Sequence, residues 1–440
     1  MWINRRLLAL SLGYFLVMLD TTIVTVALPS IGDRLGGDLS TLQWVADGYP
    51  VTFAAGLLTA GVLSDRFGGR RVFLGGLWAF AALSAACALA TGPGVLIGLR
   101  ALLGIAGALL VPSSLALIAA AHPAPENRAR ALGVWAALSG LGLVAGPVAG
   151  GLLTDAFGWP SVFLAAVPVA LAAVALLGRP DRPAPPGNTG RRVDAAGQVT
   201  SGLALGFLTY GTIARHPIAL LIAVVAIAGF VLRQRRAADP MLPSRMFADR
   251  TVGAGLAAGT LVNFGLSGVL FVLTLLFQRA HGWSPSTTGL AFLPLTVPTA
   301  VNPILTGRLV ARWGPRRPAG AGFLLMAAGV VAQLAGGVPV ALAGLFVLGC
   351  GVSLAIPALV AAVVGALPGD LAGVGSGALN AARQVGAVVG VAVLGALAAH
   401  TALIVTALVL LAGAALTAFL HSAHPADARR RSPATPSSRS

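Results

Sequence analysis

Long apolar stretches, separated by short polar breaks, run along almost the whole chain. Each holds about 18 or more residues, enough for a helix to cross the hydrocarbon core of a membrane. The stretches lack the polar–apolar alternation of membrane β-barrels, and helices satisfy their own backbone hydrogen bonds in lipid. The pattern therefore predicts an all-α membrane protein. Fourteen transmembrane helices are expected, beginning near Leu7, Gln43, Val72, Val95, Ala131, Ser161, Gly197, Pro217, Val252, Thr287, Ala319, Val340, Gly377 and Thr401.

An eleven-residue segment occurs twice and indicates how the helices are grouped. Residues 61–71 and 307–317 are identical at six of eleven positions, and they follow the second and the tenth spans. Parallel halves of this kind enclose a central site in many transporters. We expect a six-helix bundle at residues 1–178, a linker with two inserted transmembrane helices at 179–250, and a second six-helix bundle at 251–421. Residues 422–440 are expected to form a disordered cytoplasmic tail.

Composition and charge support a membrane protein and set its expected orientation. Only 10% of the 440 residues are charged, against about 25% in soluble proteins. All 29 basic residues are arginine. If the N-terminus is cytoplasmic, the loops on the opposite side hold only Arg34, Arg215 and Arg279. This asymmetry follows the positive-inside rule, so both termini are expected in the cytoplasm, and the +16 net charge requires no nucleic acid.

Several classes of chemistry are excluded by residues that the chain lacks. Without lysine it has neither a phosphate-binding-loop lysine nor a lysine Schiff base. Cys87 and Cys350 lie in separate spans, and the six histidines have no metal-ligand spacing. No HExxH or GxSxG motif occurs. We therefore expect no metal, no cofactor and no enzyme activity. The abundance of alanine, glycine, arginine and proline is typical of a GC-rich bacterial genome, so a multi-pass protein of the bacterial inner membrane is expected.

The fifth span carries small residues at regular intervals. Glycines so spaced lie on one side of a helix and let a second backbone approach, while the proline removes one helical donor. Generic packing of small residues is the alternative explanation. The motif consists of Gly133, Gly142, Gly146, Pro147, Gly150 and Gly151.

These segments together resemble a known family. The glycine–proline motif is similar to the antiporter motif of the major facilitator superfamily, and residues 61–71 are similar to its signature cytoplasmic loop. Residues 19–29, 43–49 and 240–247, Arg100 with Gly104 and Gly107, and residues 377–386 resemble motifs of its fourteen-helix drug:proton antiporter branch. The resemblance implies the major facilitator fold and proton-coupled export of hydrophobic or amphiphilic small molecules such as antibiotics.

The chain departs from the family pattern at four places. Thr25 stands where an asparagine is usual, and Asp47 where a small hydroxyl residue is common. The loop around His400 is short, and the tenth span, residues 287–307, has no carboxylate. The last departure puts divalent organic cations in doubt as substrates.

Ionisable residues inside spans are functional candidates, since each costs about 2.5–3.5 kcal/mol on insertion scales. Asp20 and Arg100 are expected about 13 Å and about 9 Å from the outer helix ends, close enough to interact. The hypothesis is that Asp20 accepts the transported proton and that Arg100 sets its pKa. A static buried pair that orients two helices is the alternative. Arg383 either snorkels to the cytoplasmic end of its helix or contacts substrate or a neighbouring helix.

The first copy of the repeated loop is expected to act as a conformational latch, which forms charge-assisted bonds in one conformation only. For Arg70 and Arg71 a purely topological role is an equal alternative. The latch residues are Gly61, Asp65, Arg66, Gly68, Arg70 and Arg71.

A substrate cavity is expected among polar and aromatic residues of the spans, although each could instead bond to or pack on a neighbouring helix. The candidates are Thr22, Asn263, Phe271, Gln278, Asn302, Asn380 and Arg383.

The leading interpretation is a proton-driven exporter that works by alternating access, and the runner-up is a carrier of a metabolite, sugar or peptide with the same fold. An intramembrane enzyme lacks a catalytic cluster, and a channel fits poorly with the repeat and the buried charges. The expected partners are a small-molecule substrate, protons and the lipid bilayer. A monomer is expected, and the need for an adaptor protein is left open.

Overall fold

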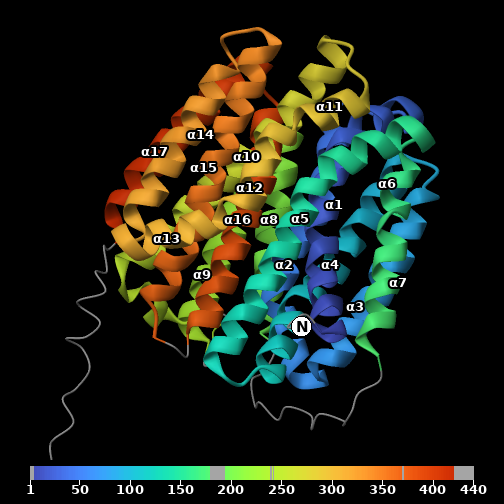
Figure 1. Ribbon diagram of the computed structural model, residues 1–440. Helices are drawn as coiled ribbons and strands as arrows, with labels where there is room; N and C mark the ends of the chain where they lie inside the picture. Colours follow the sequence, from blue (N-terminus) through green and yellow to red (C-terminus); the bar gives the residue numbers. More distant parts are fainter. Residues whose placement is uncertain (1–3, 179–193, 238–239, 241, 369–370, 421–440) are drawn as a thin grey trace, which may run out of the picture.

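The computed structural model describes residues 4–178, 194–237, 240, 242–368 and 371–420. These residues form helices that run side by side, and none of them lies in a strand (Figure 1). The predicted linker at 179–193 and the predicted tail at 422–440 lie outside the described residues. The first bundle comprises α1 (Arg5–Leu35), α2 (Leu39–Phe67), α3 (Gly69–Ala88), α4 (Pro93–Ala121), α5 (Pro125–Phe157), α6 (Pro160–Leu164) and α7 (Ala166–Leu177).

A helical pair and a second bundle complete the fold. The pair is α8 (Ala195–Ile213) and α9 (Pro217–Arg236). The second bundle comprises η1 (Ser244–Ala248), α10 (Arg250–Leu275), η2 (Leu276–Ala280), α11 (Pro285–Ala291), α12 (Leu293–Val301), α13 (Pro303–Trp313), α14 (Arg316–Ala332), α15 (Val338–Gly365), α16 (Ala372–Gly395), α17 (Ala399–Leu416) and η3 (Thr417–Phe419).

The helices account for fourteen spans, as the hydrophobic pattern predicts. Ten are long and apolar enough by themselves, α6 and α7 together counting as one. The other four are α2, α8, α14 and the segment α11–α13, which is broken into three helices at Phe292 and Asn302. With an even number of spans the described chain begins and ends on one side of the bundle. We call this the terminal side, and the side at which α1 ends the far side.

Polar residues and prolines set the helix starts. The side chains of Asn4, Asp38, Asp194, Asp249 and Ser284 each accept a hydrogen bond from a backbone N–H of the first turn of the helix that follows. Proline begins α4, α5, α9 and α11, at a position where its missing N–H leaves no helical bond unmade.

Asp194 also connects the two helices of the pair. Its carboxylate accepts hydrogen bonds from Arg233 Nε at 3.1 Å and Gln234 Nε2 at 3.3 Å on α9. Burial raises the pKa of Asp194, but the hydrogen bonds from Gly197, Arg233 and Gln234 outweigh it and hold the pKa below its usual value. The carboxylate is therefore ionised at neutral pH, the state in which it ties the start of α8 to the end of α9.

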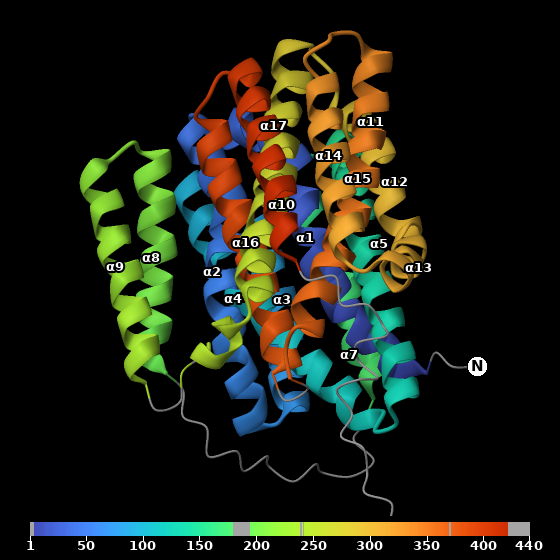
Figure 2. The same ribbon diagram turned by 90° about the vertical axis from the view of Figure 1, so that its left-hand side faces the viewer.

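Each bundle has its own apolar core, and the pair α8–α9 stands beside them (Figure 2). Gln198 of α8 donates a hydrogen bond to the Ala55 carbonyl of α2 at 2.6 Å. On α9 only Ala219 and Ala223 are buried, while apolar residues such as Val224 and Val225 are exposed. In a membrane protein an exposed apolar face of this kind lies against lipid, so α9 is a peripheral helix.

The repeated segment ends a helix at a glycine of positive φ in both bundles. Gly68 ends α2 with φ 87°, and Gly314, at the matching position, ends α13 with φ 73°. This left-handed conformation favours glycine. The sequence repeat therefore reflects a structural repeat of two bundles, and the predicted architecture of two six-helix bundles with two inserted helices is confirmed.

The glycines of the fifth span bring α5 against α1. A Cβ at Gly142 would lie 2.5 Å from the Phe15 carbonyl oxygen, and added Cβ atoms at Gly146 and Gly150 would collide with Thr22 and Ile23. Gly151 faces Pro285 of α11 just as closely. Gly133 has no such neighbour within 4 Å, because it lies toward the terminal side, where the space beside it is open. The close approach predicted for the motif thus holds for its last four glycines and not for Gly133.

We predict that Gly146→Ala destabilises the protein by about 1–3 kcal/mol, the usual cost of overpacking. Gly133→Ala is the matched control, since it adds the same methyl group to the same helix in open space. It is expected to change stability by less than about 1 kcal/mol, in the stabilising direction. Thermal unfolding of the purified variants in detergent measures both. Equal melting temperatures for the two variants would contradict the close packing of α1 and α5.

Candidate functional site

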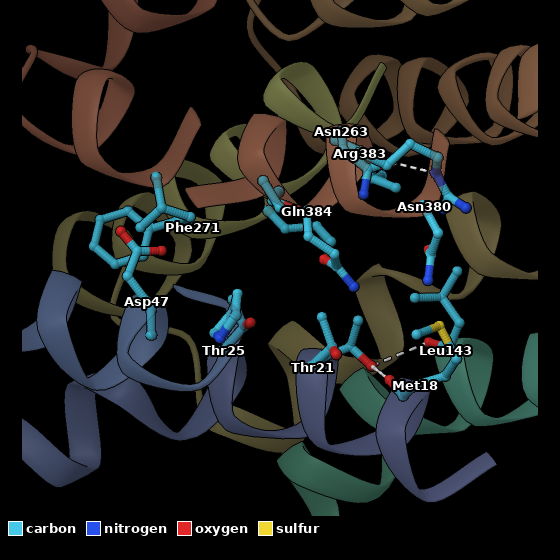
Figure 3. Close-up of a pocket in the computed structure, with 18 of the residues that line it drawn as sticks. Met18, Thr21, Thr25, Asp47, Leu143, Asn263, Phe271, Asn380, Arg383 and Gln384 are labelled. Carbon is cyan, nitrogen blue, oxygen red and sulfur yellow. Dashed lines mark hydrogen bonds between the residues drawn. The ribbon is translucent and has the colours of Figure 1, made fainter. Parts of the chain in front are cut away.

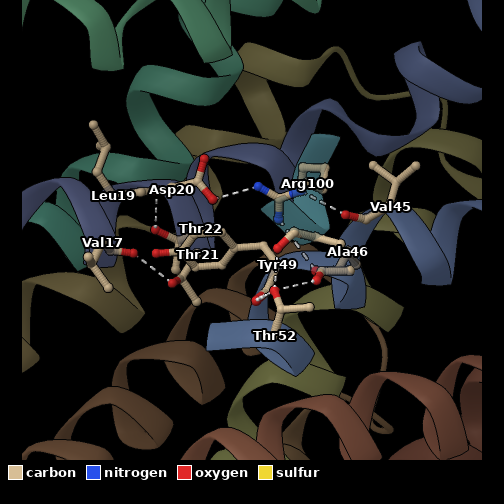
Figure 4. A network of polar contacts seen from close by, with 12 residues as sticks. Val17, Leu19, Asp20, Thr21, Thr22, Val45, Ala46, Tyr49, Thr52 and Arg100 are labelled. Atoms are coloured by element: carbon tan, nitrogen blue, oxygen red, sulfur yellow. Dashed lines mark hydrogen bonds and ion pairs between the residues drawn. The ribbon is translucent and has the colours of Figure 1, made fainter. Parts of the chain in front are cut away.

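A buried ion pair joins α1 to α4 in the first bundle (Figure 4). Arg100 Nη1 lies 2.5 Å from Asp20 Oδ2. The side chains are only 1% and 3% exposed, respectively. Asp20 and Arg100, which the sequence places at similar depth, therefore contact each other directly.

The rest of the Arg100 guanidinium is held by α2. Its Nε donates to the Val45 carbonyl at 3.0 Å and its Nη2 to the Ala46 carbonyl at 3.4 Å. The ring centroids of Tyr49 and Phe163 lie 5.1 Å and 6.0 Å from the Arg100 Cζ, within the range of cation–π attraction. Arg100 thus connects three helices, α1, α2 and α4, through one side chain.

Prolines inside the helices leave some backbone carbonyls free to accept hydrogen bonds from other helices. A proline has no N–H for the carbonyl four residues earlier, so Pro50, Pro147 and Pro357 free the carbonyls of Ala46, Leu143 and Ser353. Each of these carbonyls accepts from a side chain of another helix. The donors are Arg100 to Ala46 at 3.4 Å, Thr22 to Leu143 at 3.3 Å, and Thr306 to Ser353 at 2.9 Å.

A cavity lies between the two bundles, next to the ion pair (Figure 3). The first bundle lines it from α1, α2, α4 and α5, and the second from α10 and α16. Its volume of about 60 Å³ holds a few water molecules. The polar residues on its wall are Thr21, Thr22, Thr25, Asp47, Arg100, Asn263, Ser267, Asn380, Arg383 and Gln384.

Most of the residues expected at a substrate cavity lie on its wall. Thr22, Asn263, Phe271, Asn380 and Arg383 line it. Two others lie elsewhere because neighbouring helices offer them partners. Gln278 donates to the Val26 carbonyl at 2.8 Å, and Asn302 donates to Ser353 Oγ at 3.3 Å within the second bundle.

Arg383 points into the cavity region from α16. Its Nε donates to Asn263 Oδ1 of α10 at 3.1 Å, and both residues lie together in Figure 3. No ion pair of Arg383 occurs in the described part of the chain. Arg383 therefore contacts a neighbouring helix at the cavity wall.

Asp47 is a polar wall residue that the sequence analysis treats only as a departure from the family pattern. It lies on α2 with a side chain that is 1% exposed. Its Oδ2 has no hydrogen-bond partner among the described residues. The signal that points to it is the same as for Asp20, a carboxylate within a span. A span that begins near Gln43 places Asp47 close to its end, where a charge is common, whereas α2 begins at Leu39 and places Asp47 about one turn further inside the helix.

The bundles meet on the far side of the cavity. Gln43 of α2 donates to the carbonyls of Val391 and Ala392 of α16, both at 3.0 Å. The Ser286 N–H of α11 donates to Asp155 Oδ2 of α5 at 2.9 Å. Each of these residues, like Gln278 and Val26, lies in the far-side half of its span. The conformation is therefore closed on the far side.

The residues of the predicted latch lie on the terminal side and do not pair with each other here. Asp65 has no ion pair within the described ranges. Arg70 donates to the carbonyls of Leu177 and Gly178, Arg66 lies over the ring of Phe67 at 5.5 Å, and Gly61 faces Pro112 at van der Waals distance. Arg71, at the start of α3, has an exposed side chain. The latch remains a prediction about another conformation.

The described residues contain no group of three or more His, Cys, Asp or Glu side chains that could hold a metal ion. The site that the geometry offers is therefore a polar cavity beside one buried ion pair, with the unpaired carboxylate of Asp47 and the guanidinium groups of Arg100 and Arg383 on its walls.

Comparison with known proteins places the whole chain in one group. The family model "Major Facilitator Superfamily" matches residues 10–259 and 255–440. The chain is 36% identical to the "Tetracenomycin C resistance and export protein" of Streptomyces glaucescens over 89% of this chain and 75% of that protein. It is 35% identical to the "Methylenomycin A resistance protein" of Bacillus subtilis (strain 168), over 88% of this chain and 86% of that protein.

A solved structure shares the fold. The bacterial homologue of the human lysosomal transporter Spinster, in an inward-facing and occupied conformation, superposes with a TM-score of 0.65 at 17% identity. The match covers 94% of this chain and 96% of that one.

We predict that Gln43→Leu shifts the molecule toward a conformation open on the far side, because it removes two hydrogen bonds between the bundles. The expected shift is about 1–2 kcal/mol, roughly 5- to 30-fold in the population ratio. Spin labels at Leu39 and Leu397, which line one far-side groove, report the change as a longer distance, with Cys87 and Cys350 replaced by alanine.

Gln333→Leu is the matched control for this measurement. Gln333 also donates to two carbonyls, those of Gly329 and Ala341, but both lie in the second bundle. It should leave the distance distribution unchanged. Equal distributions in Gln43→Leu and wild type would show that these bonds do not hold the far side closed.

Proposed function

Since this chain belongs to the major facilitator superfamily, we propose that it exports hydrophobic or amphiphilic small molecules, such as antibiotics, in exchange for protons. The relatives named for drug resistance and export support a drug exporter of this family. The observation that carries the proton exchange is the buried Asp20–Arg100 pair beside a cavity between the two bundles.

Transport would proceed by alternating access to this cavity. The bundles are joined on the far side by Gln43, Gln278 and Asp155, and breaking these contacts would open the cavity there. A volume of about 60 Å³ is too small for a drug-sized ligand, whose pockets are typically about 300–1,000 Å³. Because these contacts hold the far side closed, we propose that the bundles separate on the terminal side to admit the substrate.

Asp20 is the proposed proton-coupling acid and Arg100 its partner. In one conformation the guanidinium and the carboxylate are joined by a short, charge-assisted hydrogen bond. A movement of α4 against α1 would lengthen this bond, and the buried carboxylate would then take up a proton, because an isolated buried charge is costly. Proton binding and the position of α4 are thus linked.

The orientation follows from the arginines. Among the described residues, most arginines lie on the terminal side, including Arg66, Arg70 and Arg71 where α2 meets α3, whereas the far side carries only Arg34, Arg215 and Arg279. Because short cytoplasmic loops are rich in arginine, we propose that the terminal side is cytoplasmic and that the chain resides in the bacterial inner membrane. One chain supplies both cavity walls, so we propose that a monomer is the transporting unit.

We propose that the substrate contacts Phe271, Asn380 and Arg383. Phe271 offers an apolar ring, and Asn380 and Arg383 offer hydrogen-bond donors on the same wall. A wall that combines an apolar ring with hydrogen-bond donors suits amphiphilic molecules. No carboxylate lies on α11–α13, which argues against divalent organic cations as substrates.

The test uses inverted membrane vesicles that hold a proton gradient, monitored with a pH-sensitive dye. Adding neutral, cationic and anionic drugs one by one should discharge the gradient for those that are substrates. Asp20→Asn is expected to abolish the discharge, since the amide cannot carry a proton. If no drug discharges the gradient in vesicles with folded protein, the metabolite carrier becomes the better interpretation.

Asp38→Asn is the matched control, because Asp38 is an exposed acid at the start of α2 and asparagine also caps helices. It should leave the discharge unchanged. Removing one partner of a buried ion pair lowers protein stability by about 3–5 kcal/mol. The amount of folded Asp20→Asn protein must therefore be measured by size-exclusion chromatography and matched to that of wild type. Full discharge by folded Asp20→Asn would show that Asp20 only orients the helices.

A further inference from the structure

Two buried carboxylates lie near one guanidinium in the first bundle. Asp20 of α1 is bonded to Arg100 Nη1 at 2.5 Å. Asp47 of α2 is equally buried, at 1% exposed, and shares the cavity wall with Arg100. Its Oδ2 has no hydrogen-bond partner among the described residues. The cluster therefore contains one more acid than its arginine can neutralise.

Charge balance decides where a proton is held. With both acids ionised, Asp20, Asp47 and Arg100 carry a net charge of −1 in an apolar bundle, and an unpaired buried carboxylate is far more costly than a neutral one. Asp20 is already paired, whereas Asp47 is not. The proton that balances the cluster thus belongs on Asp47.

The other charged or titratable groups do not change this balance. Arg383 of α16 lies on the opposite part of the cavity wall, bonded to Asn263, while Asp47 lies beside Phe271 (Figure 3). Tyr49 of α2 faces the Arg100 guanidinium with its ring. No ion pair joins Asp47 to any of these groups in the described ranges.

Access distinguishes the two acids. Asp47 is a lining residue of the cavity, and Asp20 is not. Because the cavity has room for a few water molecules, a proton can pass between water and Asp47 without moving a helix. Asp20 exchanges a proton only after Arg100 has left it.

Arg100 is placed to serve both acids. Its Nη1 donates a hydrogen bond to Asp20, and its Nη2 donates one to the carbonyl of Ala46, the residue directly before Asp47. The carbonyl is free to accept because Pro50 has no N–H to offer it. A rotation of the guanidinium toward the cavity would exchange one carboxylate partner for the other.

We propose that Asp47 is a second proton-binding carboxylate of this transporter and that Arg100 pairs alternately with Asp20 and Asp47. This rests on the proposed proton-coupled function. In the exchange, the Asp47 carboxyl group releases its proton to cavity water and becomes a carboxylate. The Arg100 guanidinium, which stays protonated, moves to it, and Asp20 takes up one proton from the water that reaches it. The cluster then has the same net charge as before.

The test is infrared difference spectroscopy of the purified protein in lipid as the pH is stepped from mildly acidic to mildly alkaline. The proton is the only ligand needed. Wild type should show the C=O band of a buried carboxylic acid that disappears as the pH rises. The band should be lost completely in Asp47→Asn and reappear at a shifted frequency in Asp47→Glu. In Asp20→Asn it should lose intensity, because the freed Arg100 pairs with the Asp47 carboxylate.

Asp38→Asn should leave the band unchanged, and Asp47→Thr, with the small hydroxyl common in relatives, provides a second folded variant without the acid. A band that persists in Asp47→Asn and Asp47→Thr, or the lack of any titrating band in wild type, would overturn the proposal. An unchanged band in Asp20→Asn would overturn the sharing of Arg100. Failure of the vesicle assay instead concerns the proposed transport, since the infrared band requires no drug.

Discussion

Prolines inside the helices leave some backbone carbonyls without a helical donor, and the polar contacts between helices are arranged around these carbonyls. In a membrane protein every backbone carbonyl needs a donor inside the protein. Pro50 leaves the Ala46 carbonyl without one, and Arg100 fills the gap from α4. A buried guanidinium in turn needs acceptors, and two carbonyls of α2 and the Asp20 carboxylate provide them. A kinked helix and a buried charge thus satisfy each other's requirements.

The glycine–proline motif of α5 follows the same logic. Gly142, Gly146 and Gly150 let the backbone of α1 come so close that a methyl group would not fit. Pro147 frees the Leu143 carbonyl, and at this distance the Thr22 hydroxyl reaches it. The glycines provide proximity and the proline provides the acceptor, so both parts of the motif contribute to the contact with α1. Generic packing of small residues explains the glycines but not the proline.

The sequence predicts those features that depend on local pattern or on a strong energetic penalty. The spans follow from apolar length, the two bundles from the repeat, and the contact of Asp20 with Arg100 from the cost of leaving either alone in lipid. The fate of neutral polar side chains is not predictable in this way. The sequence predicts Gln278 and Asn302 at the cavity. Gln278 instead donates to the Val26 carbonyl of α1, and Asn302 donates to Ser353. Such partners become known only once the helices are packed.

The position of Arg100 connects the chemistry to the shape of the molecule. Its acceptors Val45 and Ala46 lie within one turn of Gln43, the residue that ties α2 to α16 on the far side. In the proposed exchange, a proton that loosens Arg100 from Asp20 would change what holds the same turn of α2 in place. Because Gln43 of this turn also joins the bundles on the far side, protonation of the pair and opening of the cavity would act on one short segment. The proposed coupling then needs no longer path through the protein.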